Sequence, residues 1–459
     1  MTESKNILIT VSEGSIARNI LHSFVLKEIL QYRQVRVTLL VPEDKMALYQ
    51  KEFGMERVRI VCAPSIRVTT PHRVLGYLAR NGLRTETILM DQRTRLFVDR
   101  RFLLFFIKRM VTLVLGSSTF FHSCVRSLAV WWWPLSDDFI ATLRSIEPDE
   151  VFSTDVQDFM DVDVLVYARR YAIPSFGMVR SWDNLTTHGL VLVLPDKLLV
   201  WDNFLKEMAV KYQGVDEQNI VCVGIPQYDW YAHHEYLLSR EDFARQWRLN
   251  ASDKIIFYAG IGDYLAPHEA DVAVALSEAL RGGTLQNNVK VIFRPHPNFE
   301  FNESALKQLD NIILDKKVAV YLGSSRASWE MDQNAQVHFM NALYHADIVV
   351  STASTITLDA VAFGKPVICI AFDGFAHEPY VRSVRRYYFD FTHYIEILKT
   401  KGFQVVYTIE ELFGQIHRYL QDSSLDADGR ARILEKYIGR LDGKSGERIA
   451  KVLVTNFDF

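Results

Sequence analysis

Four hydroxyl residues between positions 351 and 355 form the segment of this sequence best suited to binding phosphate. The segment follows an expected strand at 347–350 and precedes a helical pattern, so it should lie where a helix offers free backbone N–H groups. A single Ser or Thr would fit an ordinary helix cap, but several around one turn favour an anion-binding loop. The hydroxyl residues are Ser351, Thr352, Ser354 and Thr355.

Three further residues could complete a nucleotide site. Asp359 falls about one helical turn after the hydroxyl loop, where a carboxylate can accept hydrogen bonds from ribose hydroxyls. Arg294 and His296 end an apolar run in the order Arg-Pro-His-Pro, and the two prolines fix the backbone around His296. A histidine at a strand end is often structural, but this setting favours contact with phosphate or base.

The glycine pair Gly260 and Gly262 follows another apolar run at residues 254–258. Glycines allow the backbone to approach a diphosphate closely, and they also mark any tight turn between a strand and a helix. Both interpretations stay open at this stage.

Candidate bases lie in the first half of the chain. Glu13, in a loop after the first apolar run, could accept a proton from an acceptor hydroxyl, although acidic residues also favour helix N-termini. Asp183 and His188 are alternative bases, and Trp182 beside them could stack on a sugar face. A well-capped surface loop would explain the same segment equally well. Asp155 is a further option after another strand signal.

These residues need parallel sheets to position them, because strand-like and helix-like segments alternate along both halves of the chain. We therefore expect an α/β protein with two Rossmann-like domains, whose ligands bind at the carboxyl ends of the strands. The expected strands are 6–11, 35–41, 58–62, 150–153, 174–179, 197–201 and 220–223, followed by 254–258, 289–293, 318–322, 347–350, 366–370 and 404–407. The expected domains are 1–225 and 254–459, the latter with C-terminal helices, joined by a linker at 226–253.

A largely helical insertion at about residues 65–145 interrupts the first domain. Its apolar and aromatic residues are interspersed with Arg100, Arg101, Lys108 and Arg109, so no stretch of about 20 uncharged residues is long enough to span a bilayer. Two interpretations remain open. The helices are buried parts of an enlarged domain, or they form a basic and aromatic surface that rests on a membrane.

Composition narrows the class of protein further. The chain has 459 residues, 49% of them hydrophobic, and its 52 basic and 55 acidic side chains give a net charge of −3. Such a balance argues against a dedicated nucleic-acid binder. Four cysteines are scattered singly, which disfavours a cysteine zinc site and is typical of reduced thiols in the cytoplasm. The N-terminus resembles a first β-strand rather than a signal peptide.

The motifs at 294–297 and 351–355, together with Gly-Lys-Pro at 364–366, resemble those of GT-B transferases. The most similar branches are the CDP-glycerol glycerophosphotransferases and the His-Pro-motif glycosyltransferases that use CMP-linked sugars. The ending at 442–449 also resembles the first branch. The resemblance implies that His296 and the hydroxyl loop hold the donor nucleotide, that Asp359 binds ribose, and that Glu13 supplies a base.

The resulting hypothesis is a transferase that needs no metal or cofactor. It would move a sugar or polyol-phosphate group from a nucleotide-activated donor to a hydroxyl of a glycan or lipid-linked acceptor, in surface polysaccharide or glycoconjugate biosynthesis. Closure of the donor and acceptor domains would align the reactants and exclude water. We expect a cytoplasmic protein in peripheral contact with the inner membrane face. The alternatives are a non-hydrolysing nucleotide-sugar 2-epimerase and a non-catalytic GT-B-like scaffold.

Overall fold

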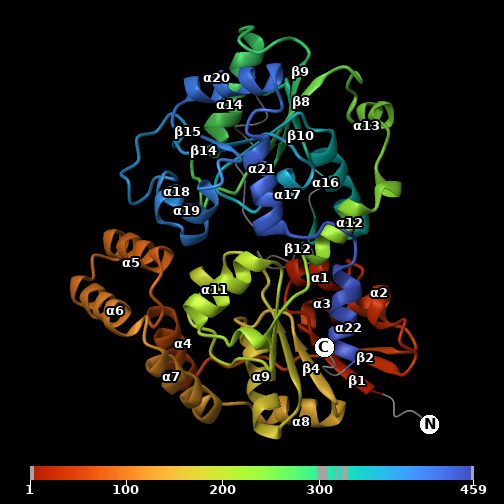
Figure 1. The fold of residues 1–459 in the computed structure, drawn as a ribbon, viewed down its shortest axis with the longest axis vertical. Coiled ribbons are helices and arrows are strands. Elements are labelled where there is room, and N and C mark those ends of the chain that lie inside the picture. Colours follow the sequence, from red (N-terminus) through yellow and green to blue (C-terminus); the bar gives the residue numbers. More distant parts are fainter. Residues whose placement is uncertain (1–4, 297–308, 317–318, 322–328, 456–459) are drawn as a thin grey trace. The chain divides into compact units, whose positions relative to one another are not determined.

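The computed structural model describes residues 5–296, 309–316, 319–321 and 329–455. The chain forms two compact units (Figure 1). The first unit comprises Met1–Asp229, Tyr321–Glu330 and Asp442–Phe459, and the second comprises Trp230–Val320 and Met331–Leu441. The chain thus enters the second unit, returns briefly to the first, and ends in the first.

The first unit is built on a seven-stranded parallel sheet with the order β3-β2-β1-β4-β5-β6-β7. Its strands are apolar runs, and consecutive residues such as Ile7, Leu8 and Ile9 are all buried, as expected for a sheet covered on both faces. The strands are β1 (Lys5–Thr10), β2 (Val35–Val41), β3 (Val58–Cys62), β4 (Glu150–Ser153), β5 (Ser175–Met178), β6 (Lys197–Val200) and β7 (Ile220–Cys222).

Helices connect these strands and cover the sheet. They are α1 (Gly14–Ile20), α2 (Val25–Ile29), α3 (Glu43–Phe53), α9 (Phe159–Tyr171), α10 (Asn184–Thr187) and α11 (Asn203–Gln213), with short turns η1 (Glu217–Asn219) and η2 (Pro226–Tyr228).

The last helix, α22 (Ser445–Val454), also belongs to the first unit, where it packs against α2. The Asp229 carboxylate fixes its start by accepting hydrogen bonds from the backbone N–H groups of Ser445 (2.9 Å) and Gly446 (2.8 Å). The sequence grouped this helix with the second domain, because helical periodicity does not reveal which sheet a terminal helix covers.

Five helices occupy the interval between β3 and β4 and confirm the expected helical insertion; α4–α7 stand as a group beside the sheet in Figure 1. Ser or Thr side chains cap most of their N-termini. In the described part of the chain, no single helix is long and apolar enough to cross a membrane, although α6 and α7 together, bent by 111°, pass that test by length and composition. The five are α4 (Thr70–Asn81), α5 (Glu86–Asp99), α6 (Phe102–Leu115), α7 (Thr119–Trp132) and α8 (Asp137–Ile146).

The second unit repeats the architecture with six parallel strands in the order β10-β9-β8-β13-β14-β15. Ile256, Val291, Val350 and Ile368, one from each of four strands, contribute to its fully buried core. The strands are β8 (Lys254–Ala259), β9 (Val289–Arg294), β10 (Ile312–Leu314), β13 (Ile348–Ser351), β14 (Val367–Ile370) and β15 (Gln404–Val406). Two parallel Rossmann-like sheets confirm the expected fold class.

One expected strand is wrong. The sequence placed a strand of the main sheet at residues 318–322, but Ile312–Leu314 pairs there with β9 instead. Val320–Tyr321 (β11) pairs with Trp329–Glu330 (β12) in a separate two-stranded sheet. Both segments are short and apolar, so only pairing with a neighbour distinguishes them.

Helices of the second unit complete the element order. They are α12 (Asp229–Ala232), α13 (Arg240–Trp247), α14 (Glu269–Arg281), α16 (Gln333–His345), α17 (Ile356–Ala362), α18 (Arg386–Asp390), α19 (Thr392–Leu398), α20 (Ile409–Gln421) and α21 (Ala427–Ile433), with the 3₁₀ helix η3 (His234–Tyr236) and the π-helix η4 (Leu434–Ile438).

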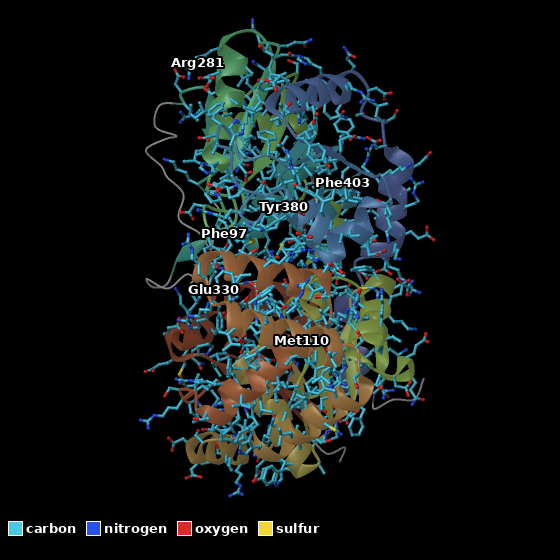
Figure 2. The ribbon with its side chains drawn as sticks, turned by 90° about the vertical axis from the view of Figure 1, so that its left-hand side faces the viewer. Phe97, Met110, Arg281, Glu330, Tyr380 and Phe403 are labelled. Carbon is cyan, nitrogen blue, oxygen red and sulfur yellow. The ribbon has the colours of Figure 1, made fainter. Side chains whose placement is uncertain are left out.

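The returning strand β12 is held inside the first unit by a buried polar group. Glu330, labelled in Figure 2, accepts hydrogen bonds from the Lys45 ammonium and from the Tyr49 hydroxyl (2.7 Å), and all three side chains are buried. Beside it the carbonyl of Trp329 lies against Gly14, where an added Cβ would come within 1.9 Å of the carbonyl oxygen. Gly14 therefore allows β12 to pack on the start of α1.

Gly14→Ala should destabilise the first unit by about 1–3 kcal/mol, because its methyl group would displace backbone that cannot move without disturbing β12. Gly76→Ala is the matched control, since no atom lies within 4 Å of its Cβ position in α4. That control should stabilise the protein by about 0.5–1 kcal/mol. Thermal unfolding of both variants measures the difference, and a Gly14→Ala protein as stable as the native one would contradict the close approach.

Candidate functional site

In the first unit, Glu13, Asp155 and Arg180 meet at the carboxyl ends of β1, β4 and β5. Arg180 Nη1 lies 2.7 Å from Glu13 Oε1 and 3.3 Å from Asp155 Oδ2. Burial alone would lower the pKa of Arg180, yet Asp155 and Glu13 beside it raise that pKa. The strand order reverses between β1 and β4, which is where open parallel sheets bind their ligands. The structure thus brings Glu13 and Asp155, far apart in sequence, to one place.

Two further carboxylates lie behind this group. Asp161 is fully buried and accepts hydrogen bonds from the Thr10 hydroxyl and from the backbone N–H of Asp155 (3.2 Å). Burial and the nearby Asp158 raise the pKa of Asp161 well above its usual range. Burial and Asp155 raise the pKa of Asp158 to about 6. A carboxyl group such as Asp158, whose raised pKa lies closer to neutral pH, is suited to general acid–base chemistry beside a fixed guanidinium.

The structure places only some of the residues predicted after β5 near Arg180. Asp183 directly precedes α10 and lies close enough to Arg180 to raise the pKa of that guanidinium, so it borders the cluster of Glu13, Asp155 and Arg180. His188 lies at the other end of α10 and is exposed, and among the described residues no interaction connects it to Arg180. The expectation that Trp182 stacks on a sugar is wrong, because its ring is only 3% exposed and packs near Phe204 in the core.

The glycine loop after β8 already holds a carboxyl side chain. Glu269, the first residue of α14, accepts hydrogen bonds from the backbone N–H groups of Ile261 (2.7 Å) and Gly262 (3.0 Å). A Cβ on Gly260 would lie 2.9 Å from the same carboxylate. Gly260 therefore makes room for the Glu269 carboxyl group. The backbone N–H groups of both glycines already have internal partners, because Gly262 donates to Glu269 and Gly260 donates to the Arg294 carbonyl. Burial raises the pKa of Glu269 to about 7.

Arg294 likewise has an internal partner. Its side chain is 5% exposed, lies over the Phe339 ring, and donates to Asp315 Oδ2 at 2.6 Å. Burial would raise the pKa of Asp315, but His338 Nε2, 3.0 Å away, and Arg294 lower it to about 2. From the sequence we expected Arg294 to contact phosphate. In the structure its guanidinium is instead buried in an ion pair with Asp315.

His296, two residues after β9, is half-buried. Of its two flanking prolines, Pro297 lies outside the described residues. The structure therefore positions His296 at the carboxyl end of β9, as the sequence predicted.

The hydroxyl loop divides into supporting and accessible residues. Ser351 is fully buried and its hydroxyl donates to the carbonyl of Ala259 (2.8 Å), so it ties β13 to β8 rather than facing a ligand. Ser354 and Thr355 are half-buried. The Tyr394 hydroxyl accepts from the Ser354 backbone N–H (2.6 Å) and donates to its carbonyl (2.8 Å), which fixes the loop.

Asp359 lies on α17, one turn after the hydroxyl loop, and is half-buried. Its Oδ1 accepts a hydrogen bond from the Tyr231 hydroxyl at 2.7 Å. Tyr231 comes from α12, so a side chain distant in sequence fixes the orientation of this carboxylate.

A small pocket lies at the carboxyl ends of β8, β13 and β14, where the strand order of the second unit reverses. Its polar lining comprises His268, Glu269, Thr352 and Asp373. His268 Nε2 is 3.3 Å from Glu378 Oε1, which adds another titratable pair. Of these four residues, only Thr352 was predicted from the sequence. The sequence feature that could have indicated this pocket is the repeated His-Glu pair, at 268–269 and at 377–378.

Within the described ranges, no group of three or more His, Cys, Asp or Glu side chains could hold a metal ion. The metal-independent mechanism stays a prediction.

The comparisons with known proteins bear on both units. Residues 189–455 match the family model of CDP-Glycerol:Poly(glycerophosphate) glycerophosphotransferase. No curated protein matches the sequence.

Similar solved structures span the whole chain. A putative UDP-N-acetylglucosamine 2-epimerase from Listeria monocytogenes is 11% identical with a TM-score of 0.56, over 100% of this chain and 97% of its own. MnaA of S. aureus with UDP is 12% identical with a TM-score of 0.54, over 99% and 98%. The glycotransferase of kitacinnamycin is 14% identical with a TM-score of 0.51, over 99% of each chain.

The two Rossmann-like units and these structural similarities define a GT-B fold. With the family match, the fold identifies the protein as a nucleotide-donor transferase of GT-B type. Because the family model covers more than half of the sequence, the chain belongs to the CDP-glycerol:poly(glycerophosphate) glycerophosphotransferase family.

Glu269 should make the stability of the protein depend on pH. The folded state holds its proton up to about pH 7, whereas the ordinary pKa is 4.5. Its contribution is therefore present below pH 4.5 and is lost as the pH rises through about 7. The unfolding free energy of the native protein should therefore fall between about pH 5 and pH 8. In the Glu269→Gln variant this fall should be smaller by up to about 3 kcal/mol.

Urea unfolding at both pH values measures this effect. Glu278→Gln is the control, because Glu278 lies on the same helix and is exposed. Parallel pH profiles for the native protein and the Glu269→Gln variant would contradict the assignment.

Proposed function

We propose that this protein transfers a polyol-phosphate group, such as glycerol phosphate, from a CDP-linked donor to the terminal hydroxyl of a glycan or lipid-linked polymer. The family match carries this proposal. In the reaction the acceptor oxygen forms a bond to the polyol-bearing phosphorus. The bond between that phosphorus and the bridging oxygen breaks, CMP leaves, and the acceptor proton passes to a base.

The donor site of this proposal lies in the second unit. His296, Thr352, Ser354 and Thr355 lie at the carboxyl ends of β9 and β13 and supply polar groups for the donor phosphates. Asp359, oriented by Tyr231, accepts from the ribose. Arg294, Ser351, Gly260 and Gly262 support the site through Asp315, β8 and Glu269 instead of contacting the donor.

The acceptor chemistry of this proposal lies in the first unit. Glu13 is the proposed base, because it is one-third exposed and fixed by Arg180, whereas Asp155 is buried behind it. The ion pair with Arg180 holds the Glu13 carboxylate in a fixed position. Asp183 contributes to the same charge cluster. His188 stays the weaker alternative. The proposed transfer uses no metal and no cofactor.

An epimerase remains the second candidate, because two of the similar folds are named as epimerases or bind UDP. Isomerisation of a UDP-sugar without any acceptor would favour it. Release of CMP that requires both donor and polymer would favour the transferase.

We also propose that the protein acts in the cytoplasm at the inner membrane face, in peripheral contact through α5–α7. In support, large apolar side chains of these helices are exposed, among them Leu103 (76%), Phe120 (79%) and Trp131 (78%). Such residues partition favourably into the membrane interface.

Removal of the donor contacts should weaken binding while the fold is kept. His296→Ala and the pair Ser354→Ala/Thr355→Ala should each cost about 1.5–3 kcal/mol of affinity for CDP-glycerol, if the lost hydrogen bonds go to phosphate. Calorimetry measures the affinity, and exposed Ser423→Ala/Ser424→Ala is the matched pair in the same unit. Native affinity in both site variants would refute the donor site.

Glu13→Gln should lower kcat by about 10²–10⁴-fold, since the amide cannot take the acceptor proton. The affinity for CDP-glycerol should not change, because donor groups lie in the other unit. Glu56→Gln, an exposed carboxylate of the first unit, is the control and should keep full activity. CMP release by a purified Glu13→Gln protein at the native rate would exclude Glu13 as the base.

A further inference from the structure

Helix α6 exposes apolar residues along most of its length. Only Thr112 of its 14 residues is buried. Figure 2 looks onto this part of the molecule, where Phe97 of α5 and Met110 of α6 are labelled. The exposed apolar face comprises Phe97 and Val98 of α5 and Phe102, Leu103, Leu104, Phe106, Ile107, Met110, Leu113 and Val114 of α6. A contiguous face of this kind marks a surface that another phase or molecule covers.

A groove of about 310 Å³ lies beside this face, between α4, α5 and α6. Its charged lining carries five cations and two anions. They are Arg73, Arg80, Arg95, Arg101 and Lys108 against Asp91 and Asp99. The groove therefore has a net positive charge, and Leu104 and Phe105 of α6 form part of its wall.

Four of the five cations of the groove fall into two groups. Arg80 and Arg95 both pair with Asp91, at 2.8 and 2.9 Å. Arg101 and Lys108, at the start and middle of α6, have no ion-pair partner within the described part of the chain. These two side chains thus keep their charge available for an external anion, next to the apolar face.

We propose that this groove binds the phosphate of an anionic lipid headgroup while α6 rests in the membrane interface. This inference rests on the membrane contact proposed above and assigns the groups that recognise the lipid. Charge complementarity favours a lipid over a second copy of the chain, because two copies would bring the same cations together. The apolar face beside the cations matches the acyl region beside a headgroup phosphate.

Vesicle binding tests the groove separately from the membrane contact. The native protein should bind phosphatidylcholine vesicles that contain phosphatidylglycerol. Arg101→Gln/Lys108→Gln should raise the vesicle Kd by roughly 25-fold, at about fivefold for each lost cation. Lys51→Gln/Arg59→Gln removes the same charge from exposed sites outside the groove and should leave the Kd unchanged.

A third variant isolates the apolar contact. Phe106→Ser/Met110→Ser changes only exposed side chains and should weaken binding to both anionic and neutral vesicles. If this variant loses binding but Arg101→Gln/Lys108→Gln does not, the membrane contact stands and the groove is overturned. If the native protein binds no vesicles, both fail.

Two other outcomes would also overturn the proposal. One is a dimer in light scattering that Phe106→Ser/Met110→Ser dissociates, which would make the face an interface between copies. The other is binding of soluble glycerol phosphate as tight as that of vesicles, with the same dependence on Arg101 and Lys108. In that case the groove takes a free phosphate.

Discussion

Parallel pairing of the strands is the constraint on which the rest of this structure depends. Parallel neighbours need crossover helices, which bury both faces of each sheet and leave only the strand ends for polar groups. Glu13, Asp155 and Arg180 therefore meet after β1, β4 and β5, although about 170 residues separate the first from the last. The same constraint brings Thr352, His268 and Asp373 to one pocket of the second unit.

Contacts among buried ionisable groups determine which of these polar groups are available to contact a ligand. Glu269 occupies the amides of the glycine loop, and Asp315 holds the guanidinium of Arg294. A buried charge needs a partner because its desolvation is costly, so such groups are matched internally before any ligand arrives. Arg294, which pairs with Asp315, lies two residues before His296, and the Tyr394 hydroxyl fixes the loop of Ser354 and Thr355. This rigidity is what a phosphoryl-transfer site requires, since positioning and electrostatics supply most of its catalysis.

The helical insertion differs from the two sheets because one of its helices exposes apolar residues. Its helices are capped and packed like those of the core, yet α6 turns apolar residues outward, and Arg101 and Lys108 lie beside them. The interpretation as buried helices is partly confirmed, because Val125, Ala129 and Trp133 are buried around α7. Helix α6 is exposed, and its contact with a membrane stays a prediction. A membrane-borne acceptor would explain why a transferase carries such a surface outside its two sheets.

The sequence by itself determined the alternation of strands and helices, and hence two parallel sheets with polar residues at their carboxyl ends. That follows from local periodicity, so most strands lie where they were expected, and the hydroxyl loop and Glu13 fall at strand ends. Only the tertiary structure decided which polar groups are already paired. Asp315 lies 21 residues after Arg294, and Tyr231 lies 128 residues before Asp359. The tertiary structure also decided three features of the fold. Ile312–Leu314 rather than residues 318–322 pairs with β9, α22 returns to the first unit, and α6 is exposed. Each depends on a partner surface that is distant in sequence, and local pattern holds no information about that surface.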